Sequence, residues 1–247
     1  MSHDIVFIRS QDRVGGVSNA FTVNLPAGYK VVSSMQLLSA EIPCSFYAIS
    51  ATYSTGVNFS NGTLTKVCSI SSGNYAISDL QAALLSWLQS NFSSSGITAV
   101  TYSSVSGKIT ITFTTGTLSV VNNTSGSLAR VLGTDALGAT TSSIGTTLTF
   151  PGVCNLFPQQ NLFINITNLQ PNVLTTANFN SFFRCQITAP PGGIVFYNAA
   201  SSVYNTVNFL TPLTNVSQLL ITLTYSDGSA VLMNNQDWSL SIGFTYN

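Results

Sequence analysis

Side chains that perform acid–base or nucleophilic chemistry are scarce in this chain, and such catalysis needs groups of matched pKa held together. The single histidine is His3, which we expect to be exposed in a flexible terminus. The seven acidic residues are Asp4, Asp12, Glu41, Asp79, Asp135, Asp227 and Asp237. Asp79 falls in the first turn of a predicted helix and Asp227 in a predicted turn, which are structural positions for a carboxylate. The sequence leaves open that two distant carboxylates meet in space, but it predicts no catalytic residue and favours a protein that is not an enzyme.

The sequence likewise contains no residue pattern typical of a metal-binding or cofactor-binding site. The four cysteines show neither a CxxC pattern nor a short cysteine–histidine spacing, which disfavours a zinc site: they are Cys44, Cys68, Cys154 and Cys185. We expect buried free thiols, while three disulfide connectivities remain open. Gly15-Gly16 and Gly192-Gly193 match no phosphate-binding glycine motif and are interpreted as turns. No cofactor and no metal ligand is predicted.

Binding to nucleic acid would require a basic patch. The seven lysines and arginines are scattered, and we interpret Arg9, Arg13 and Lys30 as solvated charges rather than contacts with a genome. The aromatic residues Phe179, Phe182 and Phe183 are typical of core packing, although an exposed docking loop is the alternative. Nothing in the sequence singles out a sugar-binding site.

The composition is that of an uncharged but hydrophobic chain. Of 247 residues, 45% are hydrophobic and only 6% are charged, with a net charge of zero, against roughly 25% charged in an ordinary soluble protein. Its surface must therefore consist of hydroxyls and amides, which favours association with copies or partners. No apolar run approaches the roughly 20 residues of a membrane-spanning helix. The first residues lack the pattern of a secretory signal, so we expect synthesis in the cytosol.

Short runs of β-branched and aromatic residues between Gly, Pro, Asn and Ser predict a mainly β, antiparallel protein. The predicted strands are Ile5–Ile8, Phe21–Leu25, Val31–Glu41 ended by Pro43, Asn58–Phe59, Leu64–Ile70, Ile97–Tyr102, Lys108–Phe113, Thr147–Phe150, Leu162–Ile166, Phe183–Thr188, Ile194–Tyr197, Thr206–Leu210, Gln218–Tyr225 and Trp238–Tyr246. A turn is predicted at Ser226-Asp227-Gly228. One helix is predicted over Ser78–Phe92 with Ser78 as N-cap, and a shorter one over Ser127–Leu132 ended by Gly133.

The number and spacing of these strands predict a single jelly-roll β-sandwich with a small α+β insertion. Residues 1–56 and 134–247 are expected to form the sandwich, and residues 57–133 the inserted α+β unit. The alternative is two domains in series, which would require the N-terminal strands to close a core without the C-terminal half.

Several segments resemble one family. Ser10–Pro26 (SQDRVGGVSNAFTVNLP) and Val31–Ile49 (VVSSMQLLSAEIPCSFYAI) are similar to the opening strands of the single jelly-roll penton and minor capsid proteins of large icosahedral DNA viruses of eukaryotes and their virophages. Ser72–Leu88, Tyr102–Phe113 and Ser127–Gly133 are similar to the inserted unit of that family, and Asp237–Tyr246 to its closing strand. Thr134 departs from the aromatic residue that often follows the short helix, which leaves the packing of that turn open.

The resemblance implies a structural capsid protein of the virion, assembled in the cytoplasm of a host cell. It favours a penton protein that forms a homopentamer at the five-fold vertices and contacts the major capsid protein and other minor capsid proteins. One alternative is a minor capsid, or cement, protein beneath the major capsomers. Another is a jelly-roll glycan-binding module or fibre head. No direct binding to nucleic acid and no membrane span is expected.

Overall fold

The computed structural model describes residues 1–50, 57–121, 126–134, 140–157, 159–169, 173–174, 180–199 and 205–246. The chain divides into two compact units, each with its own hydrophobic core. The sandwich unit comprises residues 1–46 and 159–247, and the inserted unit comprises residues 47–158. The inserted unit thus contains the predicted insertion 57–133 and extends beyond it on both sides.

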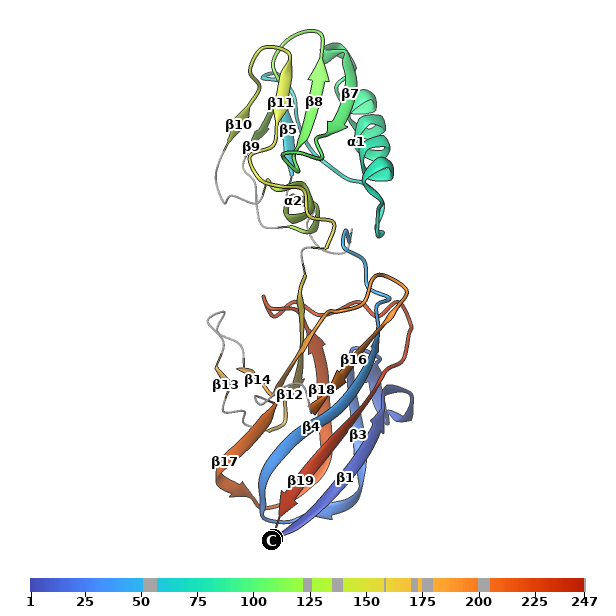
Figure 1. Ribbon diagram of the computed structural model, residues 1–247, viewed down its shortest axis with the longest axis vertical. Coiled ribbons are helices and arrows are strands. Elements are labelled where there is room, and N and C mark those ends of the chain that lie inside the picture. The colour runs from blue at the N-terminus through green and yellow to red at the C-terminus, as the bar shows by residue number, and fades with distance from the viewer. Residues whose placement is uncertain are drawn as a thin grey trace. The chain divides into compact units, whose positions relative to one another are not determined.

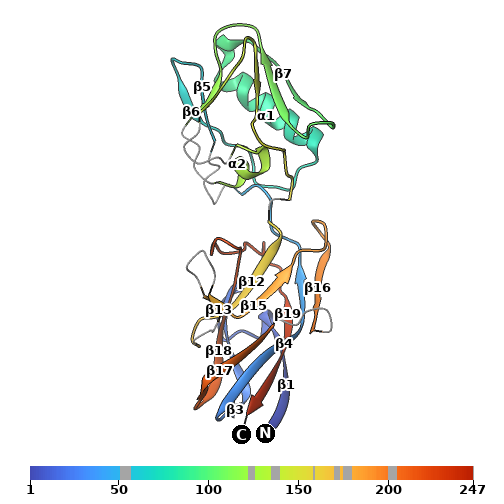
Figure 2. The same ribbon diagram turned by 60° about the vertical axis from the view of Figure 1, so that its left-hand side comes forward.

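Two antiparallel sheets build the sandwich unit (Figures 1 and 2). Sheet I has the order β1-β19-β4-β16, and β17 also pairs with β4. Its strands are β1 (Ser2–Arg9), β4 (Val32–Pro43), β16 (Ile194–Asn198), β17 (Thr206–Leu213) and β19 (Ser239–Tyr246). Sheet II has the order β15-β12-β18-β3-β2, with strands β2 (Gly15–Val17), β3 (Ala20–Tyr29), β12 (Asn161–Ile166), β15 (Phe183–Gln186) and β18 (Val216–Thr224). A separate short ladder joins β13 (Val173–Leu174) and β14 (Asn180–Ser181).

The order of these strands is that of a jelly roll. β16 and β17 pair with successive stretches of the same edge of β4, so together they occupy one strand position. With the short β2 and the β13-β14 ladder set aside, sheet I then holds the first, eighth, third and sixth described strands of the sandwich unit, and sheet II the second, seventh, fourth and fifth. This alternation between two sheets defines the double Greek key of a jelly roll. The predicted fold class is confirmed, and the inserted unit lies between β4 and β12.

Alternating residues of the long strands fill the space between the two sheets. Along β19, Leu240, Ile242 and Phe244 are buried, while Ser239 and Ser241 project from the other face. The ring of Phe244 stacks on Tyr29 with centroids 4.8 Å apart. β4 ends at Pro43, as predicted, because proline has no N–H to continue the ladder.

The inserted unit has two small sheets and two helices. The strands β5 (Asn58–Ser60), β6 (Thr65–Val67), β9 (Ser119–Val121) and β10 (Thr141–Ser142) form a sheet of order β10-β9-β5-β6. The strands β7 (Ile97–Tyr102), β8 (Ile109–Phe113) and β11 (Thr147–Thr149) form a sheet of order β11-β8-β7. The helices are α1 (Ile77–Asn91) and α2 (Ser127–Leu132). Of the described helices, none has the length and apolar character needed to cross a membrane.

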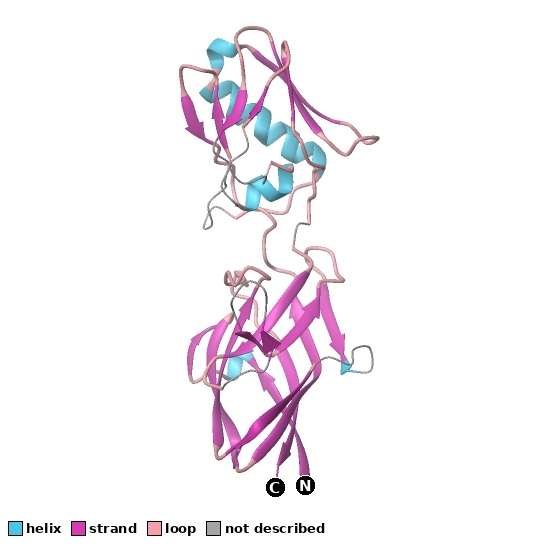
Figure 3. Cartoon of the chain, turned by 90° about the vertical axis from the view of Figure 1, so that its left-hand side faces the viewer, coloured by secondary structure: helices cyan, strands magenta, loops and turns pink. Residues whose placement is uncertain are grey.

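Helix α1 is held along its length against β7 (Figure 3). Leu80, Leu84 and Leu88 are buried, and the side-chain amides of Gln81 and Gln89 donate hydrogen bonds to backbone carbonyls of β7. The predicted N-cap was wrong: Ala76 is the cap residue, with no side-chain capping bond, and Ser78 lies inside the first turn. Packing of Ile77 against the core of the unit explains the earlier start, since burial outweighs the roughly 1 kcal/mol of a side-chain cap.

The strand predicted over Thr147–Phe150 forms, but not in the sandwich. As β11 it pairs with β8 of the inserted unit, with Leu148 opposite Ile111. The alternation of threonine with buried apolar residues indicates a strand but does not indicate which strand pairs with it. The sequence analysis therefore placed this strand in the sandwich unit by mistake. The helix α2 ends at Gly133, as predicted, with φ of 71°. Gly133 and Gly152 approach closely: the N–H of Gly152 donates to the Gly133 carbonyl at 2.9 Å.

Candidate functional site

The acidic side chains are dispersed, and several of the described ones hold local structure. Asp4 Oδ2 accepts a hydrogen bond from the Tyr246 hydroxyl at 2.9 Å, and this bond raises the pKa of Tyr246. Asp12 pairs with Arg9 at 2.7 Å, and Glu41 accepts from Ser239. Among the residues that the structure describes, no three His, Cys, Asp or Glu side chains gather as a metal site would require. Asp135, also considered from the sequence, lies outside the described residues.

His3 is exposed, as expected, but it is not in a flexible terminus. It belongs to β1, which pairs with β19 from Ser2 to Arg9. Its ring lies against Gly243, and its Nδ1 is 3.5 Å from the hydroxyl of Thr245. The continuous ladder orders this segment, because each strand residue contributes backbone bonds that the terminus alone would lack. These contacts of the ring are with a glycine and a hydroxyl, so they give no acid–base pair.

A polar cluster joins the two ends of the chain, and we call Ser10, Arg13, Asp237 and Trp238 the terminal clasp. The Ser10 hydroxyl donates to Asp237 Oδ1 at 2.7 Å and accepts the Trp238 N–H at 3.0 Å. Arg13 donates to the same carboxylate oxygen at 2.9 Å and to the Ser10 carbonyl at 2.8 Å. The indole N–H of Trp238 donates to the carbonyl of Ser18. The clasp therefore ties the turn after β1 to the start of β19.

This cluster contains a serine beside a carboxylate, the pair most suggestive of nucleophilic chemistry in the described chain. Ser10, however, has no exposed surface, and its hydroxyl is already both donor and acceptor. An acyl or phosphoryl substrate cannot reach an oxygen in that position, and a nucleophile also requires a general base. The clasp is structural. The sequence contained both halves, in the Ser10–Pro26 and Asp237–Tyr246 segments, but gave no sign that they meet.

The thiols are suited to packing rather than reaction. All four cysteines are free, with Cys44, Cys68 and Cys185 buried, as expected, and Cys154 half-buried. Burial raises the pKa of Cys68 and of Cys185 to about 12, and it also raises the pKa values of Cys44 and Cys154. A thiol reacts as its thiolate, so these groups are unreactive near neutral pH.

The aromatic residues and the glycine pairs singled out from the sequence have structural roles where the structure describes them. Phe182 and Phe183 are buried with their rings edge to face at 6.0 Å, which confirms core packing, while Phe179 lies outside the described residues. Gly192 lies in a turn, but Gly15 and Gly16 form part of β2 rather than a turn. At Gly16, φ is 92° and an added Cβ would lie 2.1 Å from the Ala20 carbonyl, so only glycine fits this close pairing of β2 with β3.

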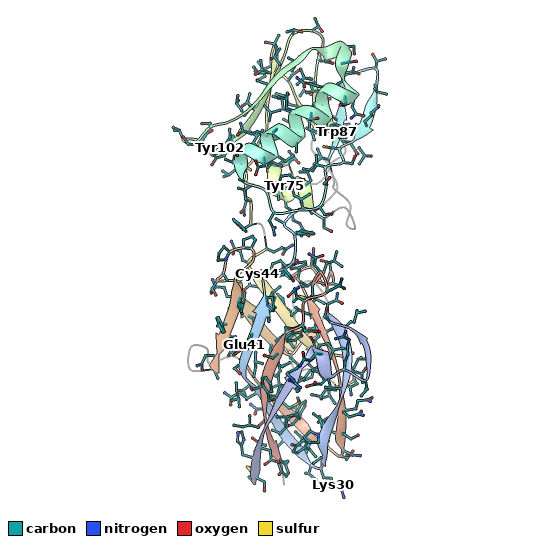
Figure 4. All side chains as sticks on the ribbon, turned by 90° about the vertical axis from the view of Figure 1, so that its right-hand side faces the viewer. Lys30, Glu41, Cys44, Tyr75, Trp87 and Tyr102 are labelled. Carbon is teal, nitrogen blue, oxygen red and sulfur yellow. The ribbon has the colours of Figure 1, made fainter. Side chains whose placement is uncertain are left out.

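Several of the described basic residues have local partners. Arg9 and Arg13 are both in ion pairs with carboxylates. Lys30 lies at the end of the sandwich unit, away from Glu41 and Cys44 at its other end (Figure 4). In the inserted unit, Lys66 donates to the side chain of Asn91. Arg9, Arg13 and Lys66 therefore support local structure.

The outer face of sheet I carries exposed apolar side chains on its two edge strands. Ile5 and Phe7 on β1, and Ile194 and Phe196 on β16, project from its outer face and are exposed. Sequence analysis missed this feature because Ile5–Ile8 and Ile194–Tyr197 are continuous apolar runs, which do not indicate which side chains face solvent. The position of both runs at sheet edges is evident only in the folded structure.

Comparison with known proteins gives a likeness to a solved structure. No protein-family model matches the chain, and no curated protein matches it. Among solved structures it is similar to the crystal structure of the selenomethionine-labelled mavirus penton protein, with a TM-score of 0.54 over 100% of both chains and 10% sequence identity. The likeness shows that the two chains share a fold along their whole length, which agrees with the resemblance seen in the sequence.

Proposed function

We propose that this chain is a structural capsid protein that forms a homopentamer at the five-fold vertices of an icosahedral virus shell. The observation that carries the proposal is the likeness in fold, over the whole of both chains, to a penton protein. The sequence resemblance is independent support, because it rests on particular segments rather than on the shape of the backbone.

The physical character of the chain fits this role. An icosahedral vertex requires one protein to contact copies of itself and neighbouring shell proteins over most of its sides. A chain with only 6% charged residues opposes such contacts little, since electrostatic repulsion between copies is small. The dispersed carboxylates, the buried Ser10 and the protonated thiols favour a structural role over an enzymatic one.

In this proposal the partners are other copies of the chain, the major capsid protein and other minor capsid proteins. The chain resides in the virion and is assembled in the cytoplasm of the host cell. The mechanism is lateral packing of sandwich units around a symmetry axis, without a cofactor and without direct contact to nucleic acid.

A reconstruction of purified particles by electron cryomicroscopy tests the proposal. The expected result is density for the jelly roll and its inserted unit at each five-fold position. Density only beneath the facets would contradict the penton role and indicate a cement protein. Particles that lack the chain would reject a structural role in the shell altogether.

A further inference from the structure

The outer face of sheet I distributes its side chains unusually. The central strands β19 and β4 present mainly polar residues there, among them Ser239, Ser241 and Glu41. The two edges present large apolar residues: Ile5 is 64% exposed, Phe7 61%, Ile194 46% and Phe196 67%. Edge strands of natural sheets usually carry charges, prolines or bulges that prevent pairing with another chain. On sheet I, charged residues of β1 lie only toward its two ends, at Asp4 and Arg9, and the middle of the strand is apolar.

The edge at β1 is the least protected of the described edges in the sandwich unit. β1 pairs with β19 over eight residues without a register shift and contains no proline. No described strand pairs with its outer side. The edges of sheet II, by contrast, are the short strands β2 and β15, and β17 carries Pro212 and an irregular register. β1 thus offers a long row of backbone donors and acceptors.

Both edge strands are apolar on two faces. The runs Ile5–Ile8 and Ile194–Tyr197 contain no polar residue except the hydroxyl of Tyr197, a pattern typical of strands covered on both sides. Within one sandwich only the inner face is covered, by the core around Val6, Ile8 and Val195. The pattern therefore points to a second covering layer or strand on the outer face of the sandwich unit.

The strand directions allow the β16 edge of a second copy to supply that strand. Each neighbour along β1-β19-β4-β16 is antiparallel, so β16 runs opposite to β1. A second copy rotated about an axis and placed with its β16 beside β1 would therefore pair antiparallel. Residues opposite one another on antiparallel strands project to the same face, so the exposed pairs of the two edges would meet on one surface.

The available area favours a ring over a dimer. A phenylalanine buries roughly 150–250 Å² when covered, so the two exposed rings have on the order of 250 Å² left to bury. Even with the two isoleucines, this lies well below the roughly 1,600 Å² of a stable interface. A single contact of this kind is weak, whereas a closed ring gives every copy two such contacts and uses both edges.

We propose that copies of this chain join head to tail through sheet I, with the β1 edge of one copy paired to the β16 edge of the next. Ile5 and Phe7 of one copy then pack against Ile194 and Phe196 of its neighbour. This inference rests on the self-association in the proposed function and adds the surface that carries it.

Charge-introducing variants of the full chain test this interface. In Phe7→Lys and Phe196→Lys, each change damages one of the two edges. Native mass spectrometry and sedimentation velocity would compare them with the unaltered chain across a range of concentrations. Ser241→Lys is the matched control, since it places the same charge on the same face but on the central strand β19. Thermal unfolding checks that every variant is folded.

The expected result is a ring for the unaltered chain and for Ser241→Lys, and monomers for each edge variant alone. An equimolar mixture of the two edge variants leaves one intact contact per pair, so it is expected to form no ring and to give a one-to-one dimer only at the highest concentrations. The intact β16 edge of the Phe7→Lys variant then pairs with the intact β1 edge of the Phe196→Lys variant, while the two altered edges repel each other and prevent further growth.

Three results would overturn the interface. Rings that survive both edge substitutions would exclude it and leave the proposed function standing. Rings lost only in Ser241→Lys would instead place the contact on the centre of the face. A chain that stays monomeric at every concentration would count against both the interface and the proposed self-association.

Discussion

Sheet I of the sandwich unit and the sheet β11-β8-β7 of the inserted unit each expose one face, and the side chains on their edge strands differ in chemistry. On sheet I of the sandwich unit, the edge strands expose Ile5 and Phe7 at one side and Ile194 and Phe196 at the other. On the sheet β11-β8-β7 of the inserted unit, the edge strands expose threonines, including Thr101, Thr147 and Thr149. The hydroxyls of Thr110 and Thr149 bond to each other across that sheet at 2.9 Å.

The difference shows that strand-forming residues can serve two kinds of surface. Threonine and phenylalanine both favour strands, so neither choice is dictated by folding. Exposed threonines give a hydrated face that is stable without a second chain. Exposed phenylalanines, by contrast, form an apolar surface of the kind that marks a protein–protein contact. In the proposed assembly, the contacts between copies therefore lie on the sandwich unit, and the sheet β11-β8-β7 of the inserted unit faces solvent.

Beneath these surfaces the two units have similar cores, and core truncations have the largest expected effect. Phe244 and Phe113 are each buried, one in each unit. Phe244→Ala and Phe113→Ala should each lower the free energy of unfolding by about 3–5 kcal/mol through lost burial and a residual cavity. Hydrogen exchange resolved by peptide would report the loss in the unit that carries each substitution. Equal loss in both units from either variant would show that they unfold as one, contrary to their separate cores.

Alkaline pH should weaken both units alike. Cys185 in the sandwich unit and Cys68 in the inserted unit have pKa values of about 12, raised by burial from an ordinary value of 9.0. Because the unfolded thiol ionises first, the stability is fully present below pH 9 and is lost as pH rises from 9 to 12. The slope per thiol is about 1.4 kcal/mol per pH unit. Denaturant titrations on both sides of the ordinary thiol pKa measure it, and Cys185→Ala should flatten the slope of the sandwich unit only.

The terminal clasp belongs to the sandwich unit alone. Asp237→Ala removes the acceptor of the buried Ser10 hydroxyl and the partner of Arg13, and should cost about 1–3 kcal/mol. Asp12→Ala is the matched control, because it breaks an exposed ion pair with Arg9 that solvent screens, and its cost should be clearly smaller. Chemical denaturation compares the two. An equal cost would mean that the clasp is no more than another surface pair.

A smaller effect, an increase in stability, is expected from a substitution in the turn between β3 and β4. Val31 has φ of 56°, in the left-handed region that β-branched residues avoid. Val31→Asn should stabilise the sandwich unit by about 0.5–1 kcal/mol, since asparagine tolerates this conformation. Thermal unfolding would show a higher melting temperature. Val31→Ile, which keeps a β-branched side chain, should leave the melting temperature unchanged.

Local patterns predicted the elements well and their partners less well. The alternation from Trp238 to Tyr246 indicated a core strand, and the Ser127–Leu132 helix with its Gly133 end was predicted to the residue, since both depend on neighbours in sequence. The pairing of β11 depends on β8, which lies far along the chain and leaves no local signal. The N-terminus of α1 was misplaced because packing of Ile77 decided it. These errors share one cause, which is that tertiary contacts override local preference.

The candidate surface was harder to predict than the fold. Nothing in Ile5–Ile8 or Ile194–Tyr197 distinguishes a central strand from an edge strand, and only the sheet order separates the two. The terminal clasp likewise needed the structure, because its halves lie at opposite ends of the chain. The sequence nevertheless contained the resemblance and the low charge from which the proposed role follows.

Hydrogen exchange of the full chain at low and high protein concentration tests the central claim most directly. Assembly through sheet I predicts slower exchange at high concentration in peptides that contain β1 and β16. Peptides that contain β7 and β11 should exchange at the same rate at both concentrations. Protection that develops over β7 and β11 while β1 and β16 stay unchanged would contradict the assignment of assembly to the sandwich unit.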